Sequence, residues 1–396
     1  MSPILLLLLC FLPLVRPITY SIGAVFEKSE LQDKSAFIKA INKVNDALKI
    51  SQPDLQFQPV VETIDDADPI EAHWATCELL SRNVVAIIGP RDALASEQAQ
   101  AVSNRFLVPY FKMQWSYYDF ADNSTFNMHP EYYAIGQLLY NFTNMAKDWE
   151  KEIVLFYSKE ESLAKFQYLF THHTGDFLIR KWNPLDQNDQ VNPFKFFRTK
   201  AKGMKWFIVD IPYKEIPHFV RKLAENQMHT TYFNYFFTDL DFAFVNPSIF
   251  YDIRANITGL SLLKFTASLP ISNELLVDDY SYMHYPFASH TRAALIQDAV
   301  TYIARVIASK QREGDSPIMI KQNTCNDGAP PNRQNQQLLH ALRSFKHPKN
   351  GDDDHFGEYL THQVQFMPDS PSRSFLNLTL LGNSQKKIEV VSYWIR

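Results

Sequence analysis

The sequence predicts an α/β protein of two lobes, each built on a largely parallel sheet that is flanked by helices. Short apolar runs typical of buried strands alternate with amphipathic helical patterns, and this alternation occurs in two successive series. With 396 residues, 46% of them hydrophobic, the chain is long enough to bury sizeable cores.

The first series covers the part of the chain before residue 112. Apolar runs predict strands at 22–26, 55–61, 84–88 and 107–111. Apolar residues at helical spacing predict helices at 34–45, 71–82 and 92–104. The strand at 55–61 alternates apolar residues mostly with glutamines, so we expect it at the edge of its sheet.

The second series repeats the same alternation and therefore predicts a second lobe. Its predicted strands are 152–157, 206–211 and 232–238, and its predicted helices are 132–149, 163–172 and 216–226. An amphipathic helix at 291–309 and a polar loop at 323–335 follow. The tail predicts successive antiparallel strands at 364–366, 375–381 and 388–394.

The amino terminus predicts export of the chain. Ile4–Val15 is apolar apart from Pro13, and Arg16-Pro17 closes the run. The run is too short to span a bilayer and fits a signal peptide at 1–17, although it lacks an early Lys or Arg and a clear cleavage site. A buried amino-terminal strand is the alternative, and no later segment is apolar enough to cross a membrane.

Two cysteines remain after that segment, Cys77 and Cys325. In a secreted chain they most simply form one disulfide, with two free buried thiols as the alternative. Four sequons, at Asn123, Asn141, Asn256 and Asn377, predict surface N-glycosylation sites. The net charge of −4, without a Lys/Arg block, argues against nucleic acid or an anionic membrane as partner.

Several segments, taken in order, carry a family resemblance. They are Ala75–Ser81 followed by Val84–Pro90, the Tyr/Phe-rich Thr230–Asp241 followed by Asn256–Leu260, the helix Ala293–Ala304, and the tail from Val364 to Trp394. Together they resemble the amino-terminal domain of kainate-type ionotropic glutamate receptors, a branch of the type I periplasmic-binding-protein fold. The resemblance covers nearly the whole chain after residue 17.

The resemblance implies a two-lobed clamshell with a cleft between the lobes. Lobe 1 would comprise 18–135 plus 260–340, and lobe 2 would comprise 136–259 plus 341–396. It also implies a disulfide between Cys77 and Cys325. Such receptors continue into an agonist-binding domain and pore helices, whereas this sequence stops two residues past Trp394. We therefore expect a freestanding module, a truncated product or an incomplete gene prediction.

In the resembling family, two lobe 1 helices form a dimer contact. Here these are 70–82 and 92–104, and the interface candidates are Trp74, Leu94, Gln98 and Val102. For each of them, a place in the core is the alternative. The implied function is subunit assembly or binding of a protein partner at the cell exterior. The expected partners are like domains of glutamate receptor subunits, or extracellular proteins of the synapse.

The alternative function is a secreted sensor that binds an amino-acid-like ligand in the cleft. Its candidate residues follow two predicted strands: Arg91, Asp92, Ser96 and Ser116. Arg91 could anchor a carboxylate, but Asp92 would repel an anion at the helix terminus. The family has no established amino-acid ligand at this cleft, so this function ranks second.

No enzyme class fits the motifs of the sequence. The hydrolase elbow, the zinc helix His-Glu-x-x-His, the P-loop and the dinucleotide fingerprint are all absent from it. His172-His173 and the acidic run ending at His355 lack the spacing of a metal site. We therefore expect neither an enzyme nor a cofactor nor a metal.

Overall fold

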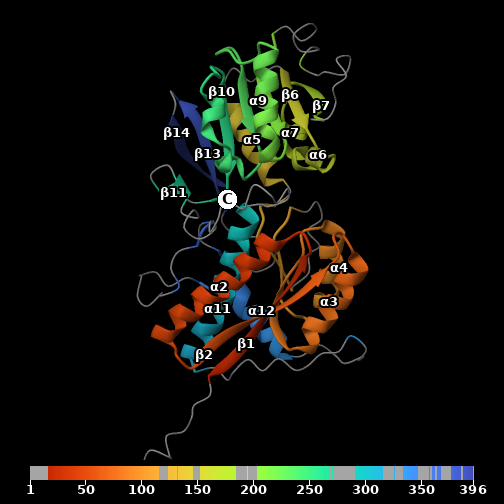
Figure 1. Ribbon diagram of the computed structural model, residues 1–396, viewed down its shortest axis with the longest axis vertical. Coiled ribbons are helices and arrows are strands. Elements are labelled where there is room, and N and C mark those ends of the chain that lie inside the picture. The colour runs from red at the N-terminus through yellow and green to blue at the C-terminus, as the bar shows by residue number, and fades with distance from the viewer. Residues whose placement is uncertain are drawn as a thin grey trace, which may run out of the picture.

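Two separate sheets organise the chain, as the sequence predicts (Figure 1). For residues 144–145, 247, 265–266, 269–270, 333–334, 376–384 and 387–395 only the backbone is described. The computed structural model describes residues 17–115, 124–131, 133–145, 152–183, 194, 203–263, 265–266, 269–270, 290–314, 325, 333–346, 356, 359–361, 364–366, 376–384 and 387–395.

Lobe 1 is built on a parallel sheet in the order β2-β1-β3-β4-β5, with β2 at the predicted edge. Its strands are β1 (Ile18–Glu27), β2 (Leu55–Ile64), β3 (Val84–Ile88), β4 (Tyr110–Lys112) and β5 (Thr125–Asn127). The helices on one face are α2 (Leu31–Ser51), α11 (His290–Arg312) and α12 (Arg333–Ser344), and those on the other are α3 (Pro69–Ser81) and α4 (Ala93–Arg105).

The central strands are apolar throughout because helices cover both of their faces. Along β1, Phe26 packs into the core under α2 and α11, whereas Val25 packs into the core under α3 and α4. In β3, Ile88 likewise packs into the core under α2 and α11, and Ile87 packs into the core under α3 and α4. Successive side chains of a strand point to opposite faces, so an unbroken apolar run is what a doubly covered strand requires.

Lobe 2 is built on a sheet in the order β14-β13-β10-β9-β8-β6-β7, in which β13 and β14 pair antiparallel and the other five strands are parallel. The strands are β6 (Glu152–Tyr157), β7 (Asp176–Lys181), β8 (Trp206–Asp210), β9 (Asn234–Phe237), β10 (Asn256–Ser261), β13 (Leu376–Ser384) and β14 (Lys387–Ile395). Helices α5 (Ala134–Met145), α6 (Glu161–Lys165) and α7 (Gln167–His172) cover one face, and α9 (Ile216–Glu225) covers the other.

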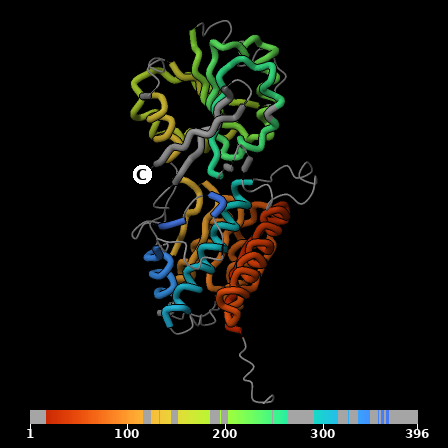
Figure 2. Tube along the Cα trace, turned by 90° about the vertical axis from the view of Figure 1, so that its left-hand side faces the viewer, coloured from red at the N-terminus to blue at the C-terminus, as the bar shows by residue number. Residues whose placement is uncertain are grey.

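The chain passes between the lobes three times, so neither lobe is one continuous segment (Figures 1 and 2). It crosses between β5 and α5, between β10 and α11, and between Phe366 and β13. Figure 2 shows α11 alongside α2 in lobe 1 after the second crossing.

One predicted lobe boundary needs correction. The sequence assigned everything after residue 340 to lobe 2, with a strand at 364–366. In the structure Phe366 instead packs edge-on against Phe126 of lobe 1 at 4.9 Å between ring centroids. Asp298 of α11 accepts hydrogen bonds from the backbone N–H groups of Leu360 and Thr361 at 2.7 and 2.8 Å. These contacts place Leu360, Thr361 and Phe366 on lobe 1, and the next described element, β13, belongs to lobe 2.

Candidate functional site

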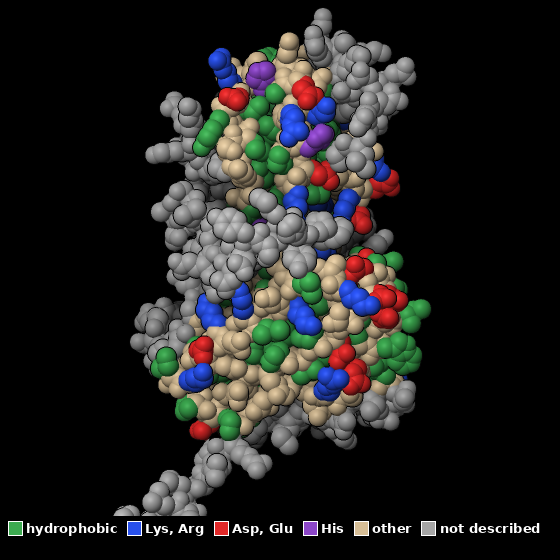
Figure 3. Space-filling view, in the orientation of Figure 1, with side chains coloured by type: hydrophobic (Ala, Val, Ile, Leu, Met, Phe, Trp, Pro, Cys, Tyr) green, Lys and Arg blue, Asp and Glu red, His purple; other side chains and the backbone are tan. Residues whose placement is uncertain are grey.

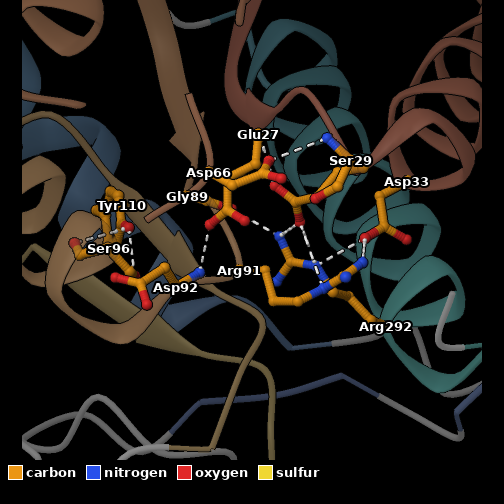
Figure 4. Close-up of polar contacts among 11 residues, drawn as sticks. Glu27, Ser29, Asp33, Asp66, Gly89, Arg91, Asp92, Ser96, Tyr110 and Arg292 are labelled. Carbon is orange, nitrogen blue, oxygen red and sulfur yellow. Dashed lines mark hydrogen bonds and ion pairs between the residues drawn. The ribbon is translucent and has the colours of Figure 1, made fainter. Parts of the chain in front are cut away.

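Charged side chains gather where β1 and β3 end (Figure 4). These strand ends lie on the side of lobe 1 that faces lobe 2 (Figure 1). In a parallel sheet the carboxyl ends of the strands are where ligands bind, so this is the position at which a cleft ligand would lie. The residues come from the end of β1, the start of α2, the turn after β3 and the start of α11: Glu27, Glu30, Asp33, Gly89, Arg91, Asp92 and Arg292.

Arg292 is the centre of this cluster and is 4% exposed. Its guanidinium lies 2.8 Å from a Glu30 carboxylate oxygen and 2.9 Å from one of Asp33, and it donates to the Gly89 carbonyl at 3.0 Å. Both carboxylate side chains are fully buried. Arg292 therefore joins α2, α11 and the turn after β3 through charge-assisted hydrogen bonds inside lobe 1.

Arg91, the predicted carboxylate anchor, is occupied by the protein itself. Its guanidinium donates to Asp33 at 3.0 Å and lies 3.8 Å from Glu30. Its side chain is 24% exposed. An anionic ligand would have to compete with Glu30 and Asp33 for this guanidinium.

The other described candidates for a cleft ligand also form hydrogen bonds within lobe 1. Asp92 caps α4, because its carboxylate accepts the N–H groups of Leu94 and Ala95 at 2.9 and 3.0 Å. Ser96 is fully buried and hydrogen-bonds the Tyr110 hydroxyl at 2.7 Å. Ser116 lies outside the described residues.

The side chain of Tyr110 requires a glycine at position 89. A Cβ on Gly89 would lie 1.8 Å from the Tyr110 hydroxyl oxygen, so any other residue would displace the ring. The turn thus places the Tyr110 hydroxyl beside Ser96 and leaves the Gly89 carbonyl to accept from Arg292.

Burial raises the pKa of Glu30 to about 7, against an ordinary value of 4.5, even though Arg292 opposes the shift and Asp33 adds to it. In lobe 2, burial and the neighbouring Asp241 raise the pKa of Asp239 to about 7 as well. Near neutral pH, the carboxyl groups of Glu30 and Asp239 therefore each gain or lose a proton at a small cost in free energy.

We expect the stability of the fold to depend on pH through Glu30. Because its pKa is raised in the folded state, its contribution is fully present below pH 4.5 and is lost as the pH rises through about 7. The change is roughly 3 kcal/mol for a shift of this size. Thermal unfolding of wild type and Glu30→Gln at pH 5 and pH 8 checks this, since the variant should gain stability relative to wild type at pH 8. A melting-temperature difference that stays the same at both pH values would contradict it.

The facing part of lobe 2 contains a second ion pair, in which the Asp210 carboxylate is buried and the Lys165 side chain is 24% exposed. Lys165 lies 3.3 Å from Asp210, which also accepts from the Thr238 hydroxyl at 2.5 Å. Burial would raise the pKa of Asp210, but Lys165 and hydroxyl hydrogen bonds outweigh it and lower the pKa. The Lys165 ammonium also lies 5.8 Å from the ring centre of Trp115, which follows β4 of lobe 1.

The outer face of lobe 1 presents apolar side chains to solvent. Ile70 and Trp74 on α3 are 69% and 62% exposed, and Leu94 on α4 is 65% exposed. The Gln98 side-chain amide lies 3.1 Å from His73 Nδ1 and links the two helices. Val102 is a correction to the interface prediction: it is 6% exposed, because its position on α4 turns toward the sheet and packs in the core.

The disulfide between Cys77 and Cys325 is present, with the two Cα atoms 5.6 Å apart. It ties α3 to the segment between α11 and α12. Among the sequons, Asn141 on α5 and Asn256 at the start of β10 are exposed, and Asn377 lies on β13. Asn123 and the predicted signal peptide through residue 16 lie outside the described residues.

No metal cluster of three or more His, Cys, Asp or Glu side chains occurs in the part of the chain that the structure describes. His172 stacks on Tyr168 at 4.0 Å between ring centres, and the acidic run before His355 is not among the described residues. Within the same described part, no helix is long and apolar enough to cross a membrane.

Sequence reasoning missed the centre of the charged cluster. Glu30, Asp33 and Arg292 were not among the predicted site residues. The signal that could have found Arg292 is a charge in the first turn of a helix, directly before the apolar run Ala293–Ile296. A buried arginine needs partners, and only the fold brings the start of α2 beside it.

Known proteins match this chain over most of its length. The family described as "Receptor family ligand binding region" matches residues 32–366. "Glutamate receptor ionotropic, kainate 1" of Homo sapiens is 24% identical over 269 residues, which cover 66% of this chain and 29% of that protein. The Mus musculus protein of the same name is 24% identical over 269 residues, 66% of this chain and 32% of its own. The Rattus norvegicus protein of that name is 25% identical over 270 residues, which cover 66% of this chain and 28% of that protein.

This chain thus spans less than a third of the length of these curated relatives. The similarity confirms the predicted resemblance to kainate-type receptors, and the two-lobed α/β fold is the one predicted. The matched proteins are receptors and receptor regions, in agreement with the expectation that the chain is not an enzyme. On the extent of the family match, this chain belongs to the receptor family ligand-binding regions.

Proposed function

We propose that the chain is an extracellular module that pairs with a like domain through α3 and α4 of lobe 1. The observation that carries the proposal is the exposure of Ile70, Trp74 and Leu94 on two adjacent helices, each at least 62%. In Figure 3 apolar side chains gather at the side of lobe 1 where α3 and α4 lie in Figure 1. Exposed apolar residues that cluster within a polar rim mark protein interfaces.

The charges around this apolar face favour a second copy of the chain as partner. Asp68 and Asp92 cap the amino-terminal ends of α3 and α4, and Arg82 and Arg105 lie at the carboxyl-terminal ends. Both helices follow parallel strands of one sheet, so the two acidic ends lie on the same side. A two-fold axis across the helices would place the acidic end of one copy against the arginines of the other.

The alternative, a sensor for an amino-acid-like ligand, has less support. Arg91, Asp92 and Ser96 all engage other residues of lobe 1. A ligand would need to break those hydrogen bonds before it gained its own. Extracellular placement is supported by the similarity to receptor proteins, by the disulfide and by the two exposed sequon asparagines on lobe 2.

The test is the mass of the purified glycosylated protein by light scattering across concentrations, alone and mixed with a kainate-type amino-terminal domain. We expect a dimer whose dissociation constant rises at least about 30-fold in Trp74→Glu or Leu94→Glu, because each buries a charge at the centre of the interface. Ile50→Glu is the matched control, since Ile50 is 74% exposed on α2 of the same lobe. A monomer at every concentration in both samples would refute the proposal.

A further inference from the structure

The first turn of α11 is held by both lobes at once. Thr291 donates from its backbone N–H and from its hydroxyl to one carboxylate oxygen of Asp241, at 2.7 and 2.6 Å. Asp241 belongs to lobe 2, where it forms a bridge with Ser261 of β10. The next residue of α11 is Arg292, which is held by Glu30 and Asp33 of lobe 1. Two consecutive residues are thus anchored in opposite lobes.

Aromatic side chains of lobe 2 hold the same turn. The ring of His290 stacks on Phe244 at 3.7 Å between ring centroids with an interplanar angle of 16°. The ring of Tyr213 also contacts His290, edge-on, with 6.0 Å between the ring centroids. Asp241, His290 and Thr291 are all at most 8% exposed, so water does not replace these contacts while the lobes stay together.

The Asp241 carboxylate performs the role of a helix N-cap. The first N–H groups of a helix lack partners within the helix, and the helix dipole favours a negative charge there. An aspartate that precedes the helix usually supplies this acceptor, as Asp68 does for α3 and Asp92 does for α4. For α11 the acceptor comes from the other lobe.

We propose that Asp241 is an interlobe cap, a helix cap that fixes the angle between the two lobes. Rotation of lobe 2 away from lobe 1 would remove the acceptor from Thr291 and leave the Asp241 carboxylate without its donors. Such a loss is costly for buried groups, so the lobes stay at one angle. The cation–π contact of Lys165 with Trp115 ties the lobes at a second point. The angle between the lobes is therefore held whether or not a partner binds.

The inference is tested by distances between spin labels on the two lobes. Labels at Lys49→Cys on α2 and Glu225→Cys on α9 stand at exposed positions, with side chains 76% and 49% exposed. We expect one narrow distance distribution in the otherwise wild-type protein. Asp241→Ala should broaden it or add a second distance, and should speed amide exchange at Thr291 by roughly tenfold, the usual effect of losing a cap.

The matched control is Asp68→Ala, which removes an N-cap within lobe 1 and should leave the distance distribution unchanged. Thr291→Val keeps the backbone N–H and removes only the hydroxyl, so it tests the same contact if Asp241→Ala fails to fold. An unchanged, narrow distribution in Thr291→Val and Asp241→Ala would overturn the interlobe cap. Dimer mass in Asp241→Ala should match wild type, which separates this test from that of the α3–α4 interface.

Discussion

Replacing Arg292 with methionine is expected to lower the free energy of unfolding by about 3–5 kcal/mol. The change removes the positive charge that faces Glu30 and Asp33, whose side chains have no exposure to solvent. The Gly89 carbonyl loses a donor at the same time. Only Arg91 remains to offset the two acids, and it approaches Glu30 no closer than 3.8 Å. Urea denaturation at pH 8, where Glu30 is ionised, measures the loss.

Arg82→Met is the control for this prediction. Arg82 also pairs with glutamates, Glu62 and Glu78, but its side chain is 49% exposed, and exposed pairs contribute at most about 1 kcal/mol. Combining Arg292→Met with Glu30→Gln and Asp33→Asn should recover part of the stability, because the uncompensated charges are gone. If Arg292→Met cost no more than Arg82→Met, the cluster would not be the buried charge network that its geometry indicates.

The sequence predicts most strands and helices because their signals are local. The apolar run at Val84–Ile88 and the helical spacing in α2 and α9 each depend on a few neighbouring residues. The edge position of β2 also follows locally, from its alternating glutamines. The short strand β5 and the strand β7 were missed, since three residues and a half-polar sequence give little periodicity.

The charged cluster could not be predicted because its members are far apart in the chain. Arg292 lies 262 residues after Glu30, and neither has a motif around it. The sequence did locate the turn after β3 correctly, but it treated Arg91 as available to a ligand. That availability depends on Asp33, which is brought there by the packing of α2 and not by any local pattern.

Removing the disulfide with Cys77→Ala and Cys325→Ala is expected to lower the free energy of unfolding by on the order of 4–5 kcal/mol. The bridge closes a loop with a sequence separation of 248, which contains the parallel strands of lobe 2 and both of the first two crossings. In the loop-entropy account, a loop this long constrains the unfolded chain strongly. Thermal and urea unfolding of the double variant measure the change.

Wild type treated with a thiol reductant should approach the stability of the double variant, and the double variant should not respond to the reductant. A difference of less than about 1 kcal/mol between untreated wild type and the double variant would show that the cross-link contributes little to the stability of the fold. Dimerisation gives an independent readout. Cys77 lies one turn after Trp74, but α3 is held on the sheet by Ala72, Leu79 and Leu80 as well. Below its melting temperature the double variant should therefore still form the dimer, because the bridge stabilises the lobe and the exposed face of α3 and α4 makes the contact.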